Sequence, residues 1–348
     1  MSFIRAIKFI CVILWLSASM GSLAATDTGY MQIIHLNVGQ GDATLVVGPN
    51  GTTILIDAGE PSKARETIIP VLNTLKIEHL DYIVATHFHN DHIGGFQYLG
   101  AFTNAATTIY DRGDCTGEPN CFAVPKTTTA SGNLSSYGKY KQALHGAYKR
   151  VSVDTPLIDL GAGAFLQFVA AGGKVWGQDA LIGGSDDENS QSVAMLISYG
   201  EFQYFIGGDL TGGGDGKRDL ETPLAAIVGD VDVYQSNHHG SPTSNNQTFL
   251  QTLQPEVAII SVGNGNRYQL PKRSVLNQFK DLRISHGFRY VFMTNEGNIG
   301  GMGPNRDIDA GLVEGDKGFI AIATEHVSLM AAKDHYIING VIMPTDDR

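Results

Sequence analysis

The stretch THFHNDHIGG, residues 86–95, places three histidines and one aspartate within six consecutive positions. Imidazole nitrogens and carboxylate oxygens are ligands that zinc and related divalent ions take in proteins. Gly94 and Gly95 follow at once and allow the chain to turn tightly beneath such ions. The spacing predicts a metal site, with a loop of polar capping residues as the alternative reading. The four candidate ligands are His87, His89, Asp91 and His92.

The segments around this motif predict strands that deliver its ligands. Apolar residues 80–86 (LDYIVAT) are typical of a buried strand that ends at His87. Alternating polarity at 31–47 and an apolar run at 52–59 predict further strands, whereas 64–77 has the helical period. Later strands are expected at 163–171, 192–200, 201–209, 231–237, 255–263, 290–295 and 318–340, with a helix at 273–283. Mostly β segments with helices between them, and ligands at strand ends, favour a layered α/β architecture with its site at one sheet edge.

Two later positions offer the partners that such a site needs. Asp209 ends the expected strand 201–209, and a carboxylate there can bridge two divalent ions, which in two-metal hydrolases lie about 3.5–4 Å apart. The stretch SNHHGS, residues 236–241, ends the next strand, so either His238 or His239 can supply a last imidazole. Each feature is unremarkable alone. Their order after the histidine motif is what indicates a dinuclear centre.

The sequence resembles the metallo-β-lactamase superfamily and, within it, the C-terminal hydrolase domain of the ComEC/Rec2 competence proteins. The matching stretches keep the same order over roughly residues 31–270. They are NVGQGDATLVV, ILIDAG, THFHNDHIGG, ENSQSVAMLISYG, FIGGD, HHGS and AIISVGNGNRY. The resemblance implies an αββα sandwich with a dinuclear metal site at the edge of the β layers. It also implies metal-dependent hydrolysis.

The resemblance assigns a role to each candidate residue. It implies that His87 and His89 bind the first ion, and that Asp91 and His92 bind the second with one of the two late histidines. Asp209 then bridges the ions, and Asp91 and Asp209 are the residues expected to act in catalysis. Asp57 corresponds to a buried residue that steadies the metal-binding loop, with an ordinary turn aspartate as the alternative. Zinc is the expected ion and manganese the alternative.

Three positions depart from the pattern of these relatives. Residues 188–190 (Glu-Asn-Ser) stand where many superfamily members have a further histidine, so the first ion is expected to lack a ligand or to take water instead. His89 stands where competence proteins often have aspartate. Leu270 stands where the competence branch usually has a histidine, and it can serve neither as an acid nor as a ligand.

The same catalytic core hydrolyses phosphodiesters, lactones, β-lactams and thioesters, so the fold does not choose the substrate. The competence resemblance favours a phosphodiester substrate. Residues 137–150 favour it too, because Lys139 and Lys141 alternate there with tyrosines that could stack the bases of a single strand. A helix with a solvated basic face is the alternative. Asn264 and Tyr268 are further candidate substrate contacts, with core packing as the alternative for Tyr268. The competing functions are a small-molecule hydrolase (a phosphocholine esterase, a lactonase or a β-lactamase-like enzyme) and an inactive binding protein.

The remaining expectations concern processing and organisation. Residues 1–24 have the positive start, short apolar run and small residues of a cleaved signal peptide, which leaves residues 25–348 as one exported hydrolase domain, secreted or periplasmic. Residues 101–150, with weak periodicity, are expected to be an insertion. In an oxidising compartment, Cys115 and Cys121 are expected to form a disulfide. The formal charge of −11 argues against tight duplex binding. Neither a membrane span after the signal nor a protein partner is evident.

Overall fold

The computed structural model describes nine stretches of the chain, and the statements below concern these. They are residues 29–114, 116–118, 122–178, 184, 186–286, 288–295, 297–298, 320–323 and 326–345. The expected signal peptide at 1–24 and the two cysteines of the expected disulfide, Cys115 and Cys121, lie outside the described residues.

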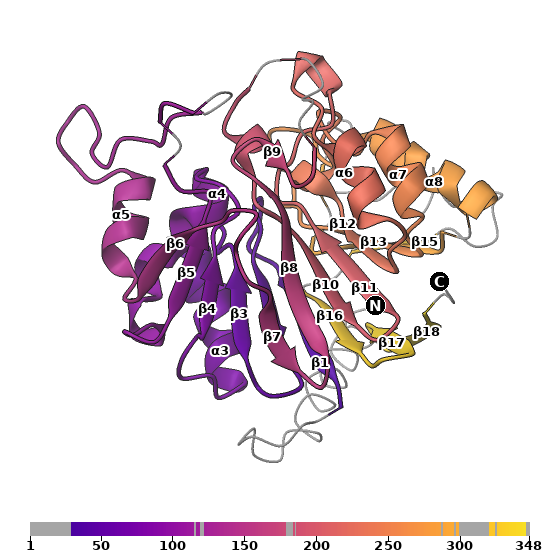
Figure 1. Cartoon of the computed structure of the whole chain (residues 1–348), viewed down its shortest axis with the longest axis horizontal. Coiled ribbons are helices and arrows are strands. Elements are labelled where there is room, and N and C mark those ends of the chain that lie inside the picture. Colours follow the sequence, from indigo (N-terminus) through magenta and orange to yellow (C-terminus); the bar gives the residue numbers. More distant parts are fainter. Residues whose placement is uncertain are drawn as a thin grey trace.

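Two twisted sheets form the centre of the molecule (Figure 1). The first has the order β18-β17-β16-β1-β2-β3-β4-β5-β6, and the second has the order β15-β14-β13-β12-β11-β10-β8-β7, with β9 paired to β8. The strands of the first sheet are β1 (Met31–Leu36), β2 (Thr44–Val47), β3 (Thr53–Ile56), β4 (Tyr82–Val84), β5 (Thr108–Asp111), β6 (Ala147–Arg150), β16 (His326–Ala331), β17 (His335–Ile338) and β18 (Val341–Pro344). Those of the second are β7 (Ile158–Gly161), β8 (Ala164–Ala171), β9 (Lys174–Val175), β10 (Ala194–Tyr199), β11 (Phe202–Ile206), β12 (Val233–Gln235), β13 (Val257–Ile260), β14 (Tyr290–Met293) and β15 (Ile320–Ala323).

Helices cover the outer face of each sheet (Figure 1). On the side of the first sheet lie α2 (Pro61–Lys63), η1 (Ala64–Ile68), α3 (Ile69–Thr74), α4 (Asn90–Ile93), η2 (Gly94–Tyr98), η3 (Gly100–Phe102) and α5 (Ser136–Ala143). On the side of the second lie α6 (Glu221–Val228), α7 (Gln247–Leu253) and α8 (Arg273–His286). The short turns η4 (Asn189–Gln191), η5 (Gly214–Gly216) and η6 (Asn237–Gly240) precede or follow strands of the second sheet.

The period-2 alternation of the strands separates three apolar layers. In β3, Ile54 and Ile56 point into the layer between the two sheets, whereas Leu55 packs into the layer beneath α3 and α5. The third layer lies between the second sheet and α6, α7 and α8, where Phe205 and Phe249 meet. The architecture is therefore an αββα sandwich, and the predicted fold class is confirmed.

Part of the segment expected to be an insertion belongs to the fold. Within residues 101–150, β5 and β6 are the last two strands of the first sheet, and α5 packs on its outer face. The expectation of an insertion is therefore wrong for these elements. The periodicity of this segment is weak because β6 is an exposed edge strand. Tyr148 is its one residue that is partly buried against the core.

Strand direction places the site. β3, β4 and β5 run parallel in the first sheet, and β11 to β15 run parallel in the second. The residues that follow β3, β4, β11 and β12 therefore meet at one edge of the sandwich, as ligand sites of open α/β sheets do. Among the described residues, no helix is long and apolar enough to cross a membrane.

Candidate metal centre

The histidine motif forms the turn between β4 and α4. His87 is fully buried, and its Nε2 lies 3.0 Å from Nδ1 of His89, which is exposed. His92 lies on the short helix α4 and is also fully buried. Gly94 and Gly95 allow the chain to pass close to its neighbours, because a Cβ atom on Gly95 would stand 2.0 Å from the carbonyl oxygen of Ala58. The turn therefore exposes one imidazole and buries two.

Asp57 holds this turn from the end of β3. Its carboxylate accepts hydrogen bonds from the backbone N–H of Thr86 (2.8 Å), the Thr86 hydroxyl (2.7 Å) and Nδ1 of His92 (2.7 Å). Since Nδ1 of His92 faces Asp57, its Nε2 points toward Asp209, 3.3 Å from Oδ1, and in the neutral imidazole this nitrogen is the one left to bind an ion. Asp57 thus orients an imidazole from behind.

Asp209 lies between two groups of histidines and offers one carboxylate oxygen to each. Oδ2 is 3.7 Å from Nε2 of His87 and 3.5 Å from Nε2 of His238. Oδ1 is 3.3 Å from Nε2 of His92 and 3.6 Å from Nε2 of His239. Asp209 is buried. This is the arrangement in which one carboxylate can bridge two ions.

The two adjacent histidines that follow β12 take different places. Nδ1 of His239 donates to the carbonyl oxygen of Ser261 (2.9 Å), so its Nε2 faces inward, 3.6 Å from Asp91 Oδ2. His239 therefore lies with Asp91, His92 and Asp209. Nδ1 of His238 instead lies 2.7 Å from the Thr243 hydroxyl, and its Nε2 faces the other oxygen of Asp209.

These separations fit metal ligands. Two nitrogens that bind one tetrahedral zinc at about 2.0–2.1 Å lie roughly 3.3 Å apart, and the contacts above range from 3.0 to 3.7 Å. Several of the converging atoms are buried without a hydrogen-bond partner, which is costly unless an ion binds them. They are Nε2 of His92, Nε2 of His239 and Oδ1 of Asp209. The donor set therefore fits divalent metal ions.

The electrostatics of the cluster show the same need for positive charge. Burial would raise the pKa of Asp209, but His238, His92 and His239 hold it well below its usual value. Burial would also lower the pKa of His92, yet Asp209 and Asp57 hold it well above the ordinary range. For His239, burial is outweighed by Asp209 and Asp42, and its pKa rises to about 9. Without metal, protons on imidazoles therefore balance the buried carboxylates.

Sequence reasoning did not single out Asp42, which is buried beside the cluster. Its Oδ2 lies 3.8 Å from Nδ1 of His92 and its Oδ1 lies 3.8 Å from Nδ1 of His239. Its backbone N–H donates to the carbonyl oxygen of Asp91 (3.2 Å), and Gly41 makes that approach possible, since a Cβ there would stand 2.3 Å from the same oxygen. An acidic residue directly after the Gly-Gln-Gly break was the available signal.

A buried ion pair supports the turn from a second direction and was also missed. The guanidinium of Arg112 donates to both carboxylate oxygens of Glu188, at 2.8 and 2.6 Å, and the Glu188 carboxylate also accepts from the backbone N–H of Phe88 (2.8 Å). Arg112 lies over the Phe88 ring, 4.5 Å from its centre. Phe88 stands between His87 and His89, so this pair fixes the residue that separates two candidate ligands.

The lysines and tyrosines of residues 137–150 are largely occupied within the fold. Tyr140 is fully buried and donates to Asp111 (3.0 Å), so the idea that it stacks a base is wrong. Lys141 lies 3.5 Å from Asp111 and 3.4 Å from the centre of the Tyr148 ring, which leaves it little freedom to reach a strand. Lys139 is exposed on α5. The sequence could not separate a packed aromatic from an exposed one at the same spacing.

The other predicted contacts, Asn264 and Tyr268, are exposed in the loop after β13. Tyr268 is 49% exposed, and its hydroxyl and ring contact the guanidinium of Arg267, at 2.6 Å and 4.8 Å respectively. The side chain of Gln40, two residues before Asp42, accepts from the N–H of Gly263 in this loop (3.2 Å). This loop, the rim, therefore joins the segment that carries Asp42 and exposes a cation and an aromatic ring, Arg267 and Tyr268.

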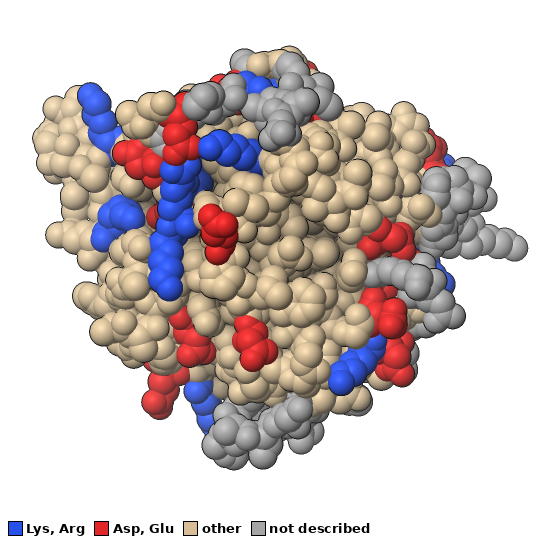
Figure 2. Space-filling view, viewed as in Figure 1, with Lys and Arg blue, Asp and Glu red and all other residues tan. Residues whose placement is uncertain are grey.

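Charge is unevenly spread over the face of the molecule that Figure 2 shows. On the face in Figure 2, Lys and Arg gather on the side of α5 and β6, with Asp and Glu among them, and most of the face carries neither sign. Glu118 forms ion pairs with Arg150 and with Lys174. A continuous basic track does not appear on this face.

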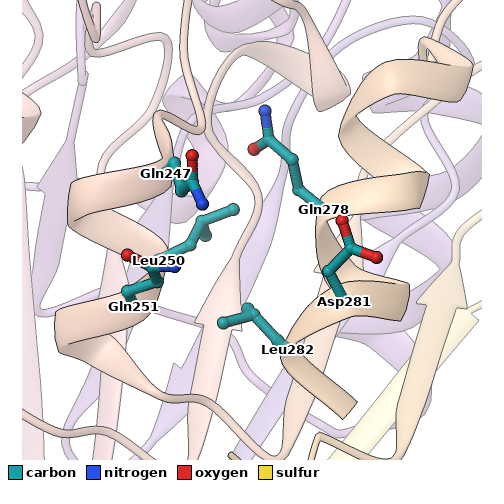
Figure 3. Close-up of a pocket in the computed structure, with 6 residues that line it drawn as sticks. All are labelled: Gln247, Leu250, Gln251, Gln278, Asp281 and Leu282. Carbon is teal, nitrogen blue, oxygen red and sulfur yellow. The ribbon is translucent and has the colours of Figure 1, made fainter. Parts of the chain in front are cut away.

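A separate hollow lies between α7 and α8 (Figure 3). Gln247, Leu250 and Gln251 face Gln278, Asp281 and Leu282 across it. None of these residues belongs to the His/Asp cluster, so the hollow is not the metal site.

Residues 36–160 match the metallo-beta-lactamase superfamily, as the sequence motifs predicted. Two bacterial proteins are similar over most of this chain. Recombination protein 2 of Haemophilus influenzae is 30% identical over 71% of this chain and 26% of its own length. Competence protein ComA of Neisseria gonorrhoeae is 27% identical over 73% of this chain and 30% of its own length. The chain thus spans about a third or less of these relatives. Among solved structures, a diphosphatase of the PhnP family is 13% identical, with a TM-score of 0.44, over 87% of this chain and 99% of that one.

Proposed function

Since the chain carries a metallo-β-lactamase domain, whose members are metal-dependent hydrolases, we propose that it is an exported phosphodiesterase that acts on single-stranded nucleic acid. One observation carries the choice of substrate. Arg267 and Tyr268 stand together, exposed to solvent, in the loop after β13, and this loop contacts Gln40, two residues before Asp42, so a cation and an aromatic ring lie on a loop next to the segment that carries Asp42.

The chemistry divides between ions and residues. When bound, two divalent ions would supply a hydroxide at neutral pH and positive charge for the leaving oxygen. His87, His89 and Asp209 would hold the first ion, and Asp91, His92, His239 and Asp209 would hold the second. Asp57 accepts a hydrogen bond from Nδ1 of His92. The neutral imidazole then carries its proton on Nδ1, and its Nε2 would bind the ion.

The rim residues would bind the rest of the substrate. The planar guanidinium of Arg267 suits a phosphate oxygen pair, and the half-exposed ring of Tyr268 offers a face on which an unpaired base can stack. Unpaired bases are accessible only in single strands, which is why the proposal favours single strands over duplex. Relatives named as competence and recombination proteins support a nucleic-acid substrate.

Export and the disulfide complete the proposal. The residue pattern of 1–24 supports secretion, and Cys115 and Cys121 flank the turn-forming residues of CTGEPNC. Closing so short a loop contributes about 2–3 kcal/mol in the chain-entropy model. Mass spectrometry of the unreduced, exported protein is expected to show a chain that begins after Ala24 and has no free thiol. An uncleaved chain, or two free thiols, would contradict this part of the proposal.

A substrate panel tests the activity. The purified protein, supplied with Zn or Mn, would be offered single-stranded DNA, duplex DNA, a bis-aryl phosphodiester, a lactone and a β-lactam. We expect the single strand and the aryl phosphodiester to be cleaved. Rapid turnover of the lactone or β-lactam with no phosphodiester cleaved would replace the proposal with a carbonyl hydrolase.

A further inference from the structure

If only one histidine after β12 serves the centre, the first ion has two protein ligands of its own, His87 and His89, and shares Asp209 with the second ion. His87, His89 and Asp209 form one group whose ligand atoms lie close together, and Asp42, His92, Asp209 and His239 form the other. Zinc takes four ligands, with three from the protein and a water in catalytic sites. The first group therefore reaches three only by counting the carboxylate that it shares with the second.

His238 lies beside the oxygen of Asp209 that faces His87. Its Nε2 is 3.5 Å from Oδ2 of Asp209, the same oxygen that lies 3.7 Å from Nε2 of His87. Both separations are near the roughly 3.3 Å expected between two ligands of one tetrahedral ion. The Thr243 hydroxyl holds Nδ1 of His238 at 2.7 Å, so the ring presents Nε2 to the site. His239 faces the opposite oxygen, Oδ1.

The backbone of this turn is built to aim both imidazoles at one carboxylate. His238 and His239 have φ angles of 51° and 55°, in the left-handed region that histidine seldom adopts. Such strain persists only where the surroundings fix it, and it gathers at functional sites. Here the side chain of Asn237 donates to buried Glu221 (2.8 Å), and the side chain of Asn245 donates to the Asn237 carbonyl oxygen (2.9 Å).

We propose that the tandem histidines serve one ion each: His238 completes the ligand set of the first ion with His87, His89 and Asp209, while His239 serves the second. The inference depends on the metal centre and not on the substrate, so it stands or falls separately from phosphodiesterase activity. The side-chain amide of Asn189 lies 3.2 Å from Nε2 of His238, so an ion bound by His238 would replace this hydrogen bond, and position 189 is the neighbour from which a histidine could serve the same ion.

Metal binding by variants tests the proposal without any activity measurement. His238→Asn and His239→Asn suit the left-handed backbone, because asparagine tolerates positive φ, and neither side chain is long enough to replace the imidazole. Stepwise affinities for Zn or Co would be measured in metal-buffered solution, with metal per chain determined by elemental analysis. His145→Asn, which removes an exposed histidine of the loop after α5, is the matched control.

We expect His238→Asn to weaken one ion by more than about 100-fold, since loss of a mere supporting residue already costs 10–100-fold. His239→Asn should weaken the other ion, and the double variant should lose both. Adding Asn189→His to His238→Asn should restore the lost ion. Two unchanged affinities in His238→Asn, or a double variant that keeps the ion retained by His239→Asn, would overturn the proposal.

A measurement on the wild-type chain covers the case in which a variant does not fold. In zinc-loaded protein labelled with ¹⁵N-histidine, the proposal expects a metal-shifted imidazole nitrogen for each of His87, His89, His92, His238 and His239. A His238 ring whose nitrogens keep metal-free shifts in the fully loaded protein would contradict it.

Discussion

His92 donates from Nδ1 to Oδ2 of Asp57 across 2.7 Å, with both side chains buried. This contact fixes which nitrogen of His92 faces the metal centre, because a neutral imidazole that donates from Nδ1 accepts at Nε2. The same carboxylate ties the backbone N–H of Thr86, immediately before the first ligand of the motif. One residue at the end of β3 thus holds both ends of the turn that carries the ligands.

Asp57→Asn is expected to weaken metal binding without unfolding the chain. Asparagine keeps the size of the side chain but loses the charge that favours the required tautomer of His92, and supporting residues of this kind are worth about 10–100-fold in metal affinity. Competition with a chromogenic chelator measures the change. Asp154→Asn, at an exposed position, is the control and should bind as the wild type does. Unaltered affinity in Asp57→Asn would remove its supporting role.

Metal uptake is expected to release protons and to strengthen as pH rises. In the metal-free protein, burial opposes the charged form of His239 but Asp209 and Asp42 raise its pKa to about 9, so at pH 7 an ion must displace a proton from it. Affinity of that site should therefore rise about tenfold per pH unit between pH 7 and 9 and level off above. Calorimetry in buffers of different ionisation enthalpy counts the released protons. A pH-independent affinity over this range would contradict the charge state assigned to His239.

Glu188→Gln is expected to destabilise the fold, because it leaves the buried guanidinium of Arg112 without its counter-ion. Removing one partner of a buried pair costs about 3–5 kcal/mol. Urea unfolding measures this loss. Replacing both partners, Arg112→Met with Glu188→Leu, should recover part of the stability but not the hydrogen bond to the Phe88 N–H.

The chain offers a matched control for this pair. Arg150→Gln breaks the solvent-exposed contact with Glu118 and should change stability by less than about 1 kcal/mol. If Glu188→Gln and Arg150→Gln had the same small effect, the Arg112–Glu188 pair would have no special part in holding the turn.

Arg267→Gln is expected to slow cleavage of single-stranded DNA and to reduce its dependence on salt, because one phosphate contact is lost. Arg289→Gln is the matched control, because Arg289 is also exposed. Arg289 precedes β14 whereas Arg267 follows its parallel neighbour β13, so the two arginines lie at opposite ends of these strands. Rates on labelled oligonucleotides at several salt concentrations measure both effects. Equal losses in the two variants would point to general charge rather than to the rim.

The sequence predicted the architecture well because its signals were local. Ligand spacing within residues 86–95, and strands that stop at Asp57, Asp209 and His238, depend on neighbours in the chain. Contacts between distant segments were not accessible in this way. Arg112 and Glu188 are 76 residues apart, and nothing in either segment announces the other. Asp42 likewise reaches the centre only after the two sheets have packed together.

The second limit on prediction from the sequence was that it does not show which amphipathic side chains are buried. Tyr140 and Tyr268 are both tyrosines beside a cation, and the sequence gives them equal claims to bind substrate. Packing separates them, since Tyr140 meets Phe96 on the buried side of α5 whereas Tyr268 is half exposed in the loop after β13. The roles of the paired histidines were open for the same reason, because the left-handed turn that parts them is set by Asn237 and Glu221.

The central claim is a dinuclear centre that Asp209 bridges, and the metal content of Asp209→Ala tests it most directly. Wild-type protein in excess zinc is expected to hold two ions per chain. Asp209→Ala removes the carboxylate that faces both groups of histidines, so both ions should weaken together and turnover should fall with them, while circular dichroism shows an intact fold. Two ions held with unchanged affinity in Asp209→Ala, with wild-type turnover, would contradict the account.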